Sequence, residues 1–388
     1  MLAFAASLAG CGGKPADDSS GGYPNDSAGD NGGASDTAAG DSGDAEPDAE
    51  DDAGSGYTMP TIDYDAAFSA FAPDAVMISA GDYKVTWAQL FAFLYGNIND
   101  IVYNTGALPK WSDVLYENMT LADALLQYSV DNAVFYMAVE YGVAQSGISL
   151  SEEDYERRDQ DLAAAFEAYG GEEEFTDMLW KSNGCNSLEL YEYLISVAML
   201  ANHFFDETYG TAGSLLTDDD IEEYVKSDGY MMAKHILRLK PEDGEEDTAQ
   251  QEIEEIYNNL EQYTGDDLEA YFSELMEEQT EDDLATFPNG YLFQYSDMVP
   301  EFSEACSNLE IGTYSDIVES VYGYHIIYRL PLNYNEIPLA NFFQGDYTSL
   351  RQIVALGMFD SVMSGWVLSL DIVNSADLDS MDLSAIFK

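Results

Sequence analysis

The chain has 388 residues, of which 74 are Asp or Glu and 13 are Lys or Arg, so its formal charge is −61. At roughly 150 residues per domain this length indicates two to three domains and excludes a single small module. The acidity excludes a nucleic-acid partner and the docking of a protein surface on anionic lipid. Three Cys and three His are too few for a disulfide framework or a His-rich metal site. Apolar residues (46%) and aromatic residues (13%) are as frequent as in folded proteins.

The first ten residues form an apolar run that ends in small residues directly before Cys11. The run resembles the end of a bacterial lipoprotein signal, whose lipobox Leu8-Ala9-Gly10-Cys11 is cut before the cysteine. An ordinary buried helix with an incidental cysteine is the alternative. Because no Lys or Arg precedes the run, residues 1–11 are expected to be an incomplete signal. The resemblance implies a lipid such as palmitate on Cys11, and thereby attachment to the extracytoplasmic face of the cell membrane.

Residues 12–60 consist mainly of Gly, Ser, Ala and Asp, with Lys14 as the one base. Such a segment buries too little apolar surface to offset its ordering entropy, so we expect a disordered acidic linker. A calcium site is the alternative, but the segment lacks the Asp-x-Asp/Asn-x-Asp/Asn-Gly pattern of calcium loops. After Cys11, no stretch reaches the roughly 18 uncharged apolar residues of a membrane span.

Residues 61–228 are predicted to form a mostly helical, chaperone-like domain. A hairpin is expected at residues 75–85, followed by a helix capped by Thr86. Two further helix starts of the capping-box type are expected at Ser151 and Thr217, each with Asp three residues later. His203, beside two phenylalanines, is interpreted as structural. Amphipathic helices are expected at residues 121–141, 151–169, 172–181 and 187–209.

Residues 229–332 carry the most specific pattern. An alternating strand, Met231-Met-Ala-Lys-His235-Ile-Leu-Arg-Leu239, precedes an acidic loop and two amphipathic helices. The segments Met298-Val-Pro-Glu-Phe302 and Tyr322-Gly-Tyr-His325-Ile-Ile-Tyr328 follow. This order of segments resembles the parvulin family of peptidyl-prolyl isomerases. The resemblance implies a small antiparallel sheet with surrounding helices.

The resemblance also implies roles for individual residues. It makes His235 and His325 a central pair, with Ser320 hydrogen-bonded to the pair. Asp282 takes the place where some parvulins have cysteine, which speaks against a nucleophilic mechanism; Asp283 is one register step away. The usual Gly-Gly before the second strand is here Asn289-Gly290, which affects the rim of the pocket. The apolar wall for a proline ring is expected from Leu292, Met298 and Phe302.

Isomerisation of an Xaa-Pro bond requires no bond cleavage, because the barrier of about 18–20 kcal/mol comes from lost amide resonance. A dry pocket with fixed dipoles that binds the twisted amide best is sufficient. Neither a cofactor nor a metal is expected. Two hydrogen-bonded histidines inside a sheet could alternatively be core supports, and Met298 and Phe302 could be plain core residues.

The loop after the first strand contains five acids and no base at residues 241–247. Because phosphate is held by Arg or Lys, we expect unphosphorylated Xaa-Pro in unfolded, newly exported polypeptides as substrate. The sequence leaves open whether Cys185 and Cys306 meet.

Residues 333–388 contain a long helical stripe from Leu350 to Val367, which must bury its apolar side elsewhere. The helical block 61–228 is the expected partner. The resulting α+β architecture, a parvulin domain inserted into a helical domain, resembles the PrsA/SurA type of extracytoplasmic foldase.

Two hypotheses remain: a lipid-anchored isomerase and foldase, or a non-catalytic holdase that uses the parvulin domain as a binding platform. The set of His235, His325, Ser320, Met298 and Phe302 favours the isomerase. A solute-binding lipoprotein is a third and distant reading, because no nucleotide or sugar-pocket pattern occurs. The sequence does not predict the oligomeric state.

Overall fold

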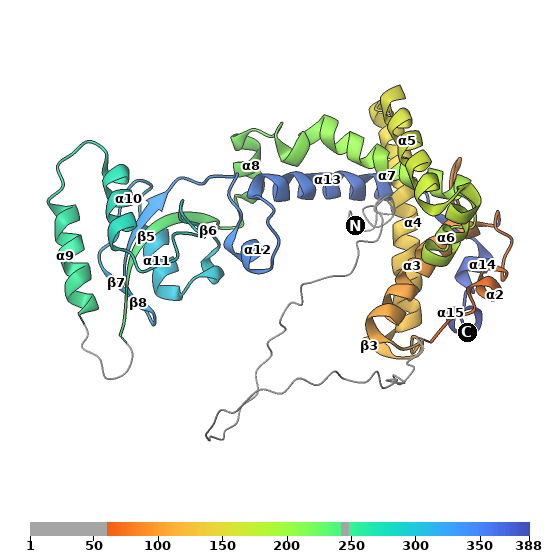
Figure 1. Ribbon diagram of the computed structural model, residues 1–388, viewed down its shortest axis with the longest axis horizontal. Helices are drawn as coiled ribbons and strands as arrows, with labels where there is room; N and C mark the ends of the chain where they lie inside the picture. The colour runs from red at the N-terminus through yellow and green to blue at the C-terminus, as the bar shows by residue number, and fades with distance from the viewer. Residues whose placement is uncertain (1–59, 242–247) are drawn as a thin grey trace, which may run out of the picture. The chain divides into compact units, whose positions relative to one another are not determined.

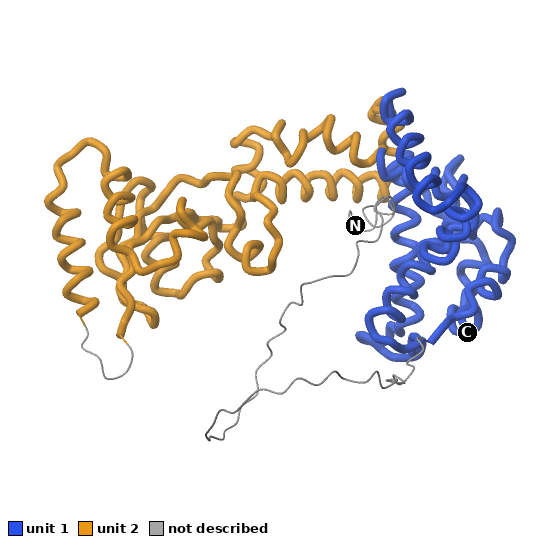
Figure 2. The backbone as a smooth tube through the Cα atoms, in the orientation of Figure 1, with its two compact units in different colours: residues 1–141, 150–199, 370–388 blue, residues 142–149, 200–369 orange. Residues whose placement is uncertain are grey.

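The computed structural model describes residues 60–241 and 248–388. The expected signal, the lipid on Cys11 and the acidic linker therefore lie outside the described residues, as does most of the acidic loop after the first strand of the 229–332 segment. Figure 2 shows two compact units, and the second is largely an insertion into the sequence of the first. The first comprises the residues up to Tyr141, Leu150–Met199 and Leu370–Lys388; the second comprises Gly142–Ser149 and Leu200–Ser369.

The first unit is mainly helical (Figure 1). Its three-stranded sheet has the order β2-β1-β9, so the C-terminal segment pairs with the expected N-terminal hairpin. The last residues of α4 and α7 belong to the second unit. The elements are α2 (Tyr64–Phe68), β1 (Val76–Ala80), β2 (Tyr83–Thr86), α3 (Trp87–Thr105), β3 (Val114–Tyr116), β4 (Met119–Thr120), α4 (Leu121–Ser146), α5 (Glu152–Tyr169), α6 (Glu172–Asn183), α7 (Leu188–Tyr209), β9 (Val373–Asn374), α14 (Ala376–Asp379) and α15 (Leu383–Ile386).

Side-chain caps define where these helices begin. Thr86 caps α3 in a capping box with Gln89, and Ser151 caps α5 in a box with Asp154, as the sequence predicts. In the core of the unit, the fully buried Phe91 stacks on Trp180 and on Phe387, with ring centroids 5.6 and 5.7 Å away. The C-terminal residues are thus part of the aromatic core of the N-terminal unit.

The second unit contains a four-stranded antiparallel sheet in the order β6-β5-β8-β7 (Figure 1). The two longest strands, β5 and β8, pair along their lengths at its centre. The elements of this unit are η2 (Thr211–Gly213), α8 (Asp218–Val225), β5 (Met231–Leu239), α9 (Ala249–Glu261), α10 (Leu268–Gln279), β6 (Tyr291–Phe293), η3 (Tyr295–Asp297), α11 (Pro300–Asn308), β7 (Val318–Glu319), β8 (Gly323–Leu330), α12 (Leu339–Phe343) and α13 (Leu350–Ser369).

Each face of this sheet has its own apolar cluster. Residues Met232 and Ile236 of β5 belong to the cluster that α9 and α10 cover. The alternate residues Met231 and Ala233 belong to the cluster that includes Phe302 of α11. Because successive side chains of a strand point to opposite faces, a single residue of register decides which cluster a side chain joins.

The core of the sheet continues beyond Leu332, the boundary expected from the sequence. Pro338 forms a bridge with Leu292 of β6, and the adjacent Leu339 is buried in the cluster around Phe302. Leu350 and Val354 of α13 are buried in the cluster of the opposite face. The last 56 residues expected as one segment, 333–388, are therefore divided between the two units.

Helix α13 packs against α8 and against the end of α7. Its Phe359 lies 5.6 Å from Phe205, and Trp366 lies 4.9 Å from Phe204, measured between ring centroids. Gly142 of α4 makes room for Trp366, since a Cβ at this glycine would overlap the indole ring. By length and composition α13 is apolar enough to cross a membrane, which the sequence analysis did not foresee; core helices meet the same criterion.

Candidate functional site

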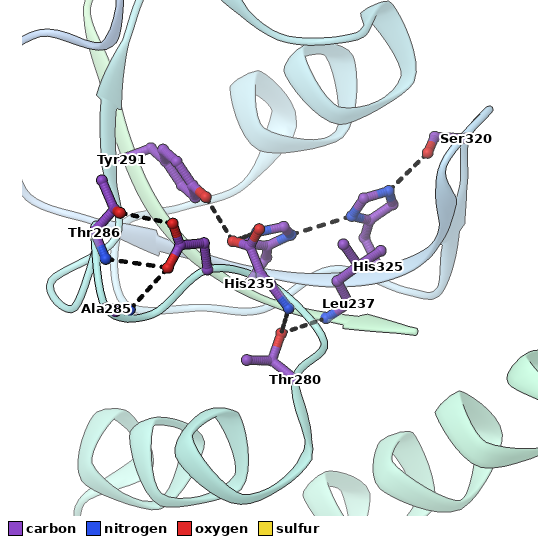
Figure 3. Close-up of polar contacts among 10 residues, drawn as sticks. His235, Leu237, Thr280, Ala285, Thr286, Tyr291, Ser320 and His325 are labelled. Carbon is purple, nitrogen blue, oxygen red and sulfur yellow. Dashed lines mark hydrogen bonds and ion pairs between the residues drawn. The ribbon is translucent and has the colours of Figure 1, made fainter. Parts of the chain in front are cut away.

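Two histidines meet on one face of the four-stranded sheet (Figure 3). His235 of β5 is opposite Ile327 of β8. His325 of β8 is opposite Leu237, so the histidines are diagonal neighbours that share a face. Their Nδ1 atoms are 3.1 Å apart, and their rings are inclined by only 15°. The pairing expected from the sequence is therefore present.

A carboxylate lies at one end of this pair. Oδ2 of Asp282 is 2.6 Å from Nε2 of His235, and the same oxygen accepts a 2.6 Å hydrogen bond from the hydroxyl of Tyr291. The loop that carries Asp282 is tied to β5, because the hydroxyl of Thr280 accepts the backbone N–H groups of Leu237 (3.0 Å) and Asp282 (3.3 Å). Figure 3 shows these contacts around His235.

A hydroxyl lies at the other end. Oγ of Ser320 is 2.7 Å from Nε2 of His325, and it accepts the backbone N–H of Tyr322 at 3.1 Å. Lys240 donates to the carbonyl oxygen of Ser320 and pairs with Glu319, both at 2.8 Å. Asp282, His235, His325 and Ser320 thus form one hydrogen-bonded series, which we call the polar series. Ser320 and His325 are both about 4% exposed, so the Ser320 end of the polar series is closed to solvent.

The hydrogen-bond partners define a consistent proton arrangement. Ionised Asp282 only accepts, so His235 donates to it from Nε2. When His235 is neutral, its Nδ1 accepts from Nδ1–H of His325, whose Nε2 then accepts the hydroxyl proton of Ser320. Each ring nitrogen has a complementary partner, which a buried polar series requires.

The surroundings fix the charges at both ends. Burial and the nearby His235 lower the pKa of His325 to about 3, so this ring is neutral at physiological pH. Burial alone would raise the pKa of Asp282, but the hydrogen bond and the charge of His235, together with the hydrogen bond from Tyr291, outweigh it and lower the pKa to about 2. Burial and the neighbouring Asp282 raise the pKa of Tyr291. The site therefore combines an ionised carboxylate on Asp282 with a neutral ring on His325.

An aromatic ring stands edge-on to the histidines. Phe302 of α11 is 2% exposed, and its ring centroid is 5.2 Å from that of His235 and 5.7 Å from that of His325. Phe293 lies 5.7 Å behind Phe302. Met298 is half-buried against the same cluster. Phe302 and Met298 thus form an apolar wall beside the polar series.

Leu292 does not lie with them. It pairs with Met232 in the β5–β6 register and is buried in the cluster on the opposite face of the sheet. Its neighbours Tyr291 and Phe293 point to the histidine face instead, because side chains alternate along a strand. The expectation that Leu292, Met298 and Phe302 form one apolar wall is therefore wrong for Leu292. The residue of β6 that contacts Phe302 is Phe293.

The structure also separates the two adjacent aspartates. Asp282 contacts His235, whereas Asp283 caps the following turn by accepting from Ala285 and Thr286. Tyr291 was missed by the sequence analysis. The alternation of Tyr291, Leu292 and Phe293 could have placed it on the histidine face, but its hydrogen bond to Asp282 depends on the conformation of the loop that precedes β6.

Cys185 and Cys306 lie in different units. Cys306 is buried in the same cluster as Phe302, and its sulfur accepts a 3.3 Å hydrogen bond from Arg329. Burial raises the pKa of this thiol. In the part of the chain that the structure describes, no group of three or more His, Cys, Asp or Glu side chains is arranged to hold a metal ion.

The family model described as "Rotamase: PPIC-type PPIASE domain" matches residues 235–330, the stretch that contains the polar series and Phe302. This match is limited to residues 235–330, and it agrees with the resemblance to parvulins predicted from the sequence.

The relatives of the chain include foldases named PrsA. The protein of Halalkalibacterium halodurans is 41% identical over 127 residues, 31% of this chain and 34% of that protein. The protein of Caldanaerobacter subterraneus is 28% identical over 268 residues, 66% of this chain and 74% of that protein. The chain thus spans only 34% of the first of these two relatives.

Among solved structures, PrsA from Bacillus cereus is similar at 21% identity and a TM-score of 0.31, covering 71% of this chain and 98% of that one. PrsA from Bacillus subtilis is similar at 17% identity and a TM-score of 0.24, covering 65% and 87%. The resemblance to PrsA foldases predicted from the sequence is supported by the sequence similarity to the relatives with that name.

Proposed function

We propose that this protein is a peptidyl-prolyl cis–trans isomerase that acts as a foldase on exported polypeptides. The observation that carries the proposal is the continuous series of Asp282, His235, His325 and Ser320 beside the ring of Phe302, inside the stretch that matches the PPIC-type family. The foldase names of the relatives support the cellular role.

The client's proline ring packs against Phe302 and Met298 in this proposal. The apolar wall removes the ring from water and fixes the position of the Xaa-Pro bond relative to the polar series. The barrier to rotation, about 18–20 kcal/mol, comes from amide resonance, so catalysis needs only to favour the twisted amide over both planar isomers.

Asp282 favours the twisted amide through its charge. The resonance form of a planar amide places negative charge on the carbonyl oxygen, and a nearby carboxylate repels that charge. Twisting reduces the resonance, so the repulsion is weaker in the transition state than in the ground state. His235 and Tyr291 hold the carboxylate in its ionised form and in one position. No covalent step is involved.

His325 and Ser320 act as positioning residues. They hold the ring of His235 through its Nδ1 atom, so that its Nε2 atom points at Asp282. Because His325 is neutral, it adds no positive charge that would compete with the carboxylate for the client's carbonyl oxygen.

The clients are unfolded segments with unphosphorylated Xaa-Pro bonds. The acidic composition of the loop after β5 disfavours phosphate, and the overall charge of −61 repels anionic ligands in general. The protein acts at the extracytoplasmic face of the membrane, held by a lipid on Cys11 at the end of the acidic linker. This placement is supported by the lipobox sequence.

Exchange spectroscopy on an unphosphorylated Ala-Pro peptide with the full chain tests the function. We expect cis/trans exchange to accelerate in proportion to the protein concentration. A folded chain that prevents aggregation of an unfolded client but leaves the exchange rate at its uncatalysed value would instead support the holdase hypothesis.

Mass spectrometry of the native N-terminus tests the anchor. A diacylglyceryl group on Cys11 as the first residue is the expected result, and a Cys11→Ser variant should be released from the membrane. An unmodified or uncleaved Cys11 would contradict the proposed attachment.

A further inference from the structure

A group of aromatic side chains, some of them exposed, lies next to the candidate site. Phe343 at the end of α12 is 73% exposed, and Tyr347 in the following loop is 67% exposed. With the half-buried Phe287 and Phe342 they form a surface that we call the aromatic shelf. Phe342, Phe343 and Tyr347 lie outside the residues that match the PPIC-type family.

The aromatic shelf is connected to the site by a series of ring contacts. Tyr291 lies 5.6 Å from His235, Phe287 lies 4.5 Å from Tyr291, and Phe342 lies 4.9 Å from Phe287, between ring centroids. Tyr347 lies 5.5 Å beyond Phe342. Since an extended chain rises about 3.3 Å per residue, a client held at Phe302 reaches the shelf within a few residues of its proline.

Three carboxylates accompany the aromatic shelf: Asp283 and Asp346 are exposed, and Glu336 is half-buried. Asp346 stands between Phe343 and Tyr347 in the chain and accepts hydrogen bonds from Thr348 and Asn341, which lower its pKa. Asp283 caps the turn that carries Phe287. Glu336, just before α12, accepts from Asn289 at 3.2 Å. Within residues 60–241 and 248–388, no ion pair neutralises any of the three.

We propose that the aromatic shelf binds an Arg or Lys side chain of the client, a few residues from the proline in the client's sequence. This inference rests on the proposed function, whose site it extends with a basic-residue subsite. Aromatic faces attract cations, and uncompensated carboxylates beside them add a screened ion-pair attraction. An acidic or neutral residue gains neither contribution.

Arginine fits this surface best. Its guanidinium group is planar, stacks on aromatic rings and donates to carboxylates at the same time. The apolar part of its side chain covers ring surface that is otherwise exposed to water. The strong negative charge of the whole chain attracts basic segments over longer distances and repels acidic ones.

The test uses the full chain and a set of Xaa-Pro peptides that differ at one position, which carries Arg, Gln or Glu. Moving this position stepwise away from the proline on either side locates the subsite. Exchange spectroscopy gives kcat/KM, and fluorescence anisotropy of the same labelled peptides gives Kd. We expect Arg to be favoured over Gln by about threefold or more at low salt, and the preference to shrink as salt is added.

Two variants remove the subsite, and two matched controls leave it in place. Phe343→Ala combined with Tyr347→Ala, and separately Asp346→Asn, should bring the ratio of Arg to Gln affinity close to one. Leu368→Ala removes an equally exposed apolar side chain from α13, and Asp360→Asn removes an exposed charge from the same helix. Both controls should retain the preference.

An Arg preference that persists in both shelf variants, or is absent from the unmodified chain, overturns the inference. So does a self-association, seen by sedimentation, that disappears in the double variant, because the shelf is then covered by a second copy.

Two outcomes distinguish this inference from the proposed function. If cis/trans exchange is accelerated equally for all peptides, the basic-residue subsite is wrong but the isomerase function stands. If the Arg peptide binds tightly but its exchange is not accelerated, the isomerase function is wrong but the subsite stands.

Discussion

The two faces of the sheet β6-β5-β8-β7 are built from alternate residues of the same strands, yet they differ in kind. On one face Ile236, Ile326 and Phe272 form a cluster under α9 and α10. The other face combines Phe302 with the hydrogen-bonded series that contains His235 and His325. An apolar face needs only to exclude water, whereas the polar face needs a partner for every buried donor and acceptor. The face with the stricter requirement, the polar one, is the face that carries the proposed chemistry.

The largest effect should distinguish the two faces directly. Phe302→Ala and Phe272→Ala each remove a buried ring and should each cost about 3–5 kcal/mol of unfolding free energy. Only Phe302→Ala should also lower kcat/KM of the folded protein, by at least about tenfold, because it removes contacts to the proline ring. Urea unfolding and exchange spectroscopy measure the two quantities separately. Normal rates from a folded Phe302→Ala chain would show that the pocket does not operate.

Leu292 sharpens the comparison, because it belongs to β6 of the same sheet but to the apolar face. Leu292→Ala should cost about 2–5 kcal/mol of unfolding free energy, since the side chain is buried. We expect kcat/KM of the folded fraction to stay unchanged, in contrast to Phe302→Ala. A clear rise in KM for proline peptides with Leu292→Ala would contradict this placement of the side chain.

Acid should destabilise the polar face through His325. Its pKa is about 3 in the folded protein against an ordinary value of 6.5. As the pH falls from 6.5 towards 3, the unfolded chain binds a proton that the folded chain does not, so stability is lost.

A His325→Gln variant isolates this contribution, because both proteins share all the carboxylates. The unfolding free energy of the unmodified chain minus that of the variant should be largest near neutral pH and shrink towards pH 4. A difference that does not depend on pH would mean that this histidine is not held neutral. Circular dichroism establishes that the variant is folded.

The smallest effect concerns Tyr291, whose hydroxyl donates a hydrogen bond to Asp282 at one end of the polar series. Tyr291→Phe removes one of two hydrogen bonds to Oδ2 of Asp282. The pKa of Asp282, about 2 in the unmodified chain, should rise but stay below its ordinary value of 3.8, because His235 still donates to it. Carbon-13 titration of the Asp282 carboxyl group measures the change. An unchanged pKa would show that the hydroxyl does not contribute to the charge at the site.

Much of the candidate site follows from short stretches of sequence. The alternation in Met231–Leu239 predicts the first strand, and the segment around His325 and the segment Met298–Phe302 complete the resemblance to the PPIC-type family. Leu292 was placed wrongly because the resemblance assigned it to the wall, although the alternation of β6 directs it to the other face. The aromatic shelf could not be found this way, since Phe287 and Phe342 are far apart in the sequence and meet only in the folded chain. The alternation of β6 could have placed Tyr291 on the histidine face, but it could not predict the hydrogen bond to Asp282.

The sequence alone determined the local features of this protein: the hairpin at β1 and β2, the caps at Thr86 and Ser151, and the pattern of the rotamase stretch. Caps and strand alternation involve residues a few positions apart, so they can be read directly. Only the tertiary structure decided that Asp282 faces His235 and that Leu339 of α12 packs in the cluster around Phe302. It also decided that the C-terminal segment is shared between two units. These arrangements depend on which distant segments bury one another, and no local pattern encodes that choice.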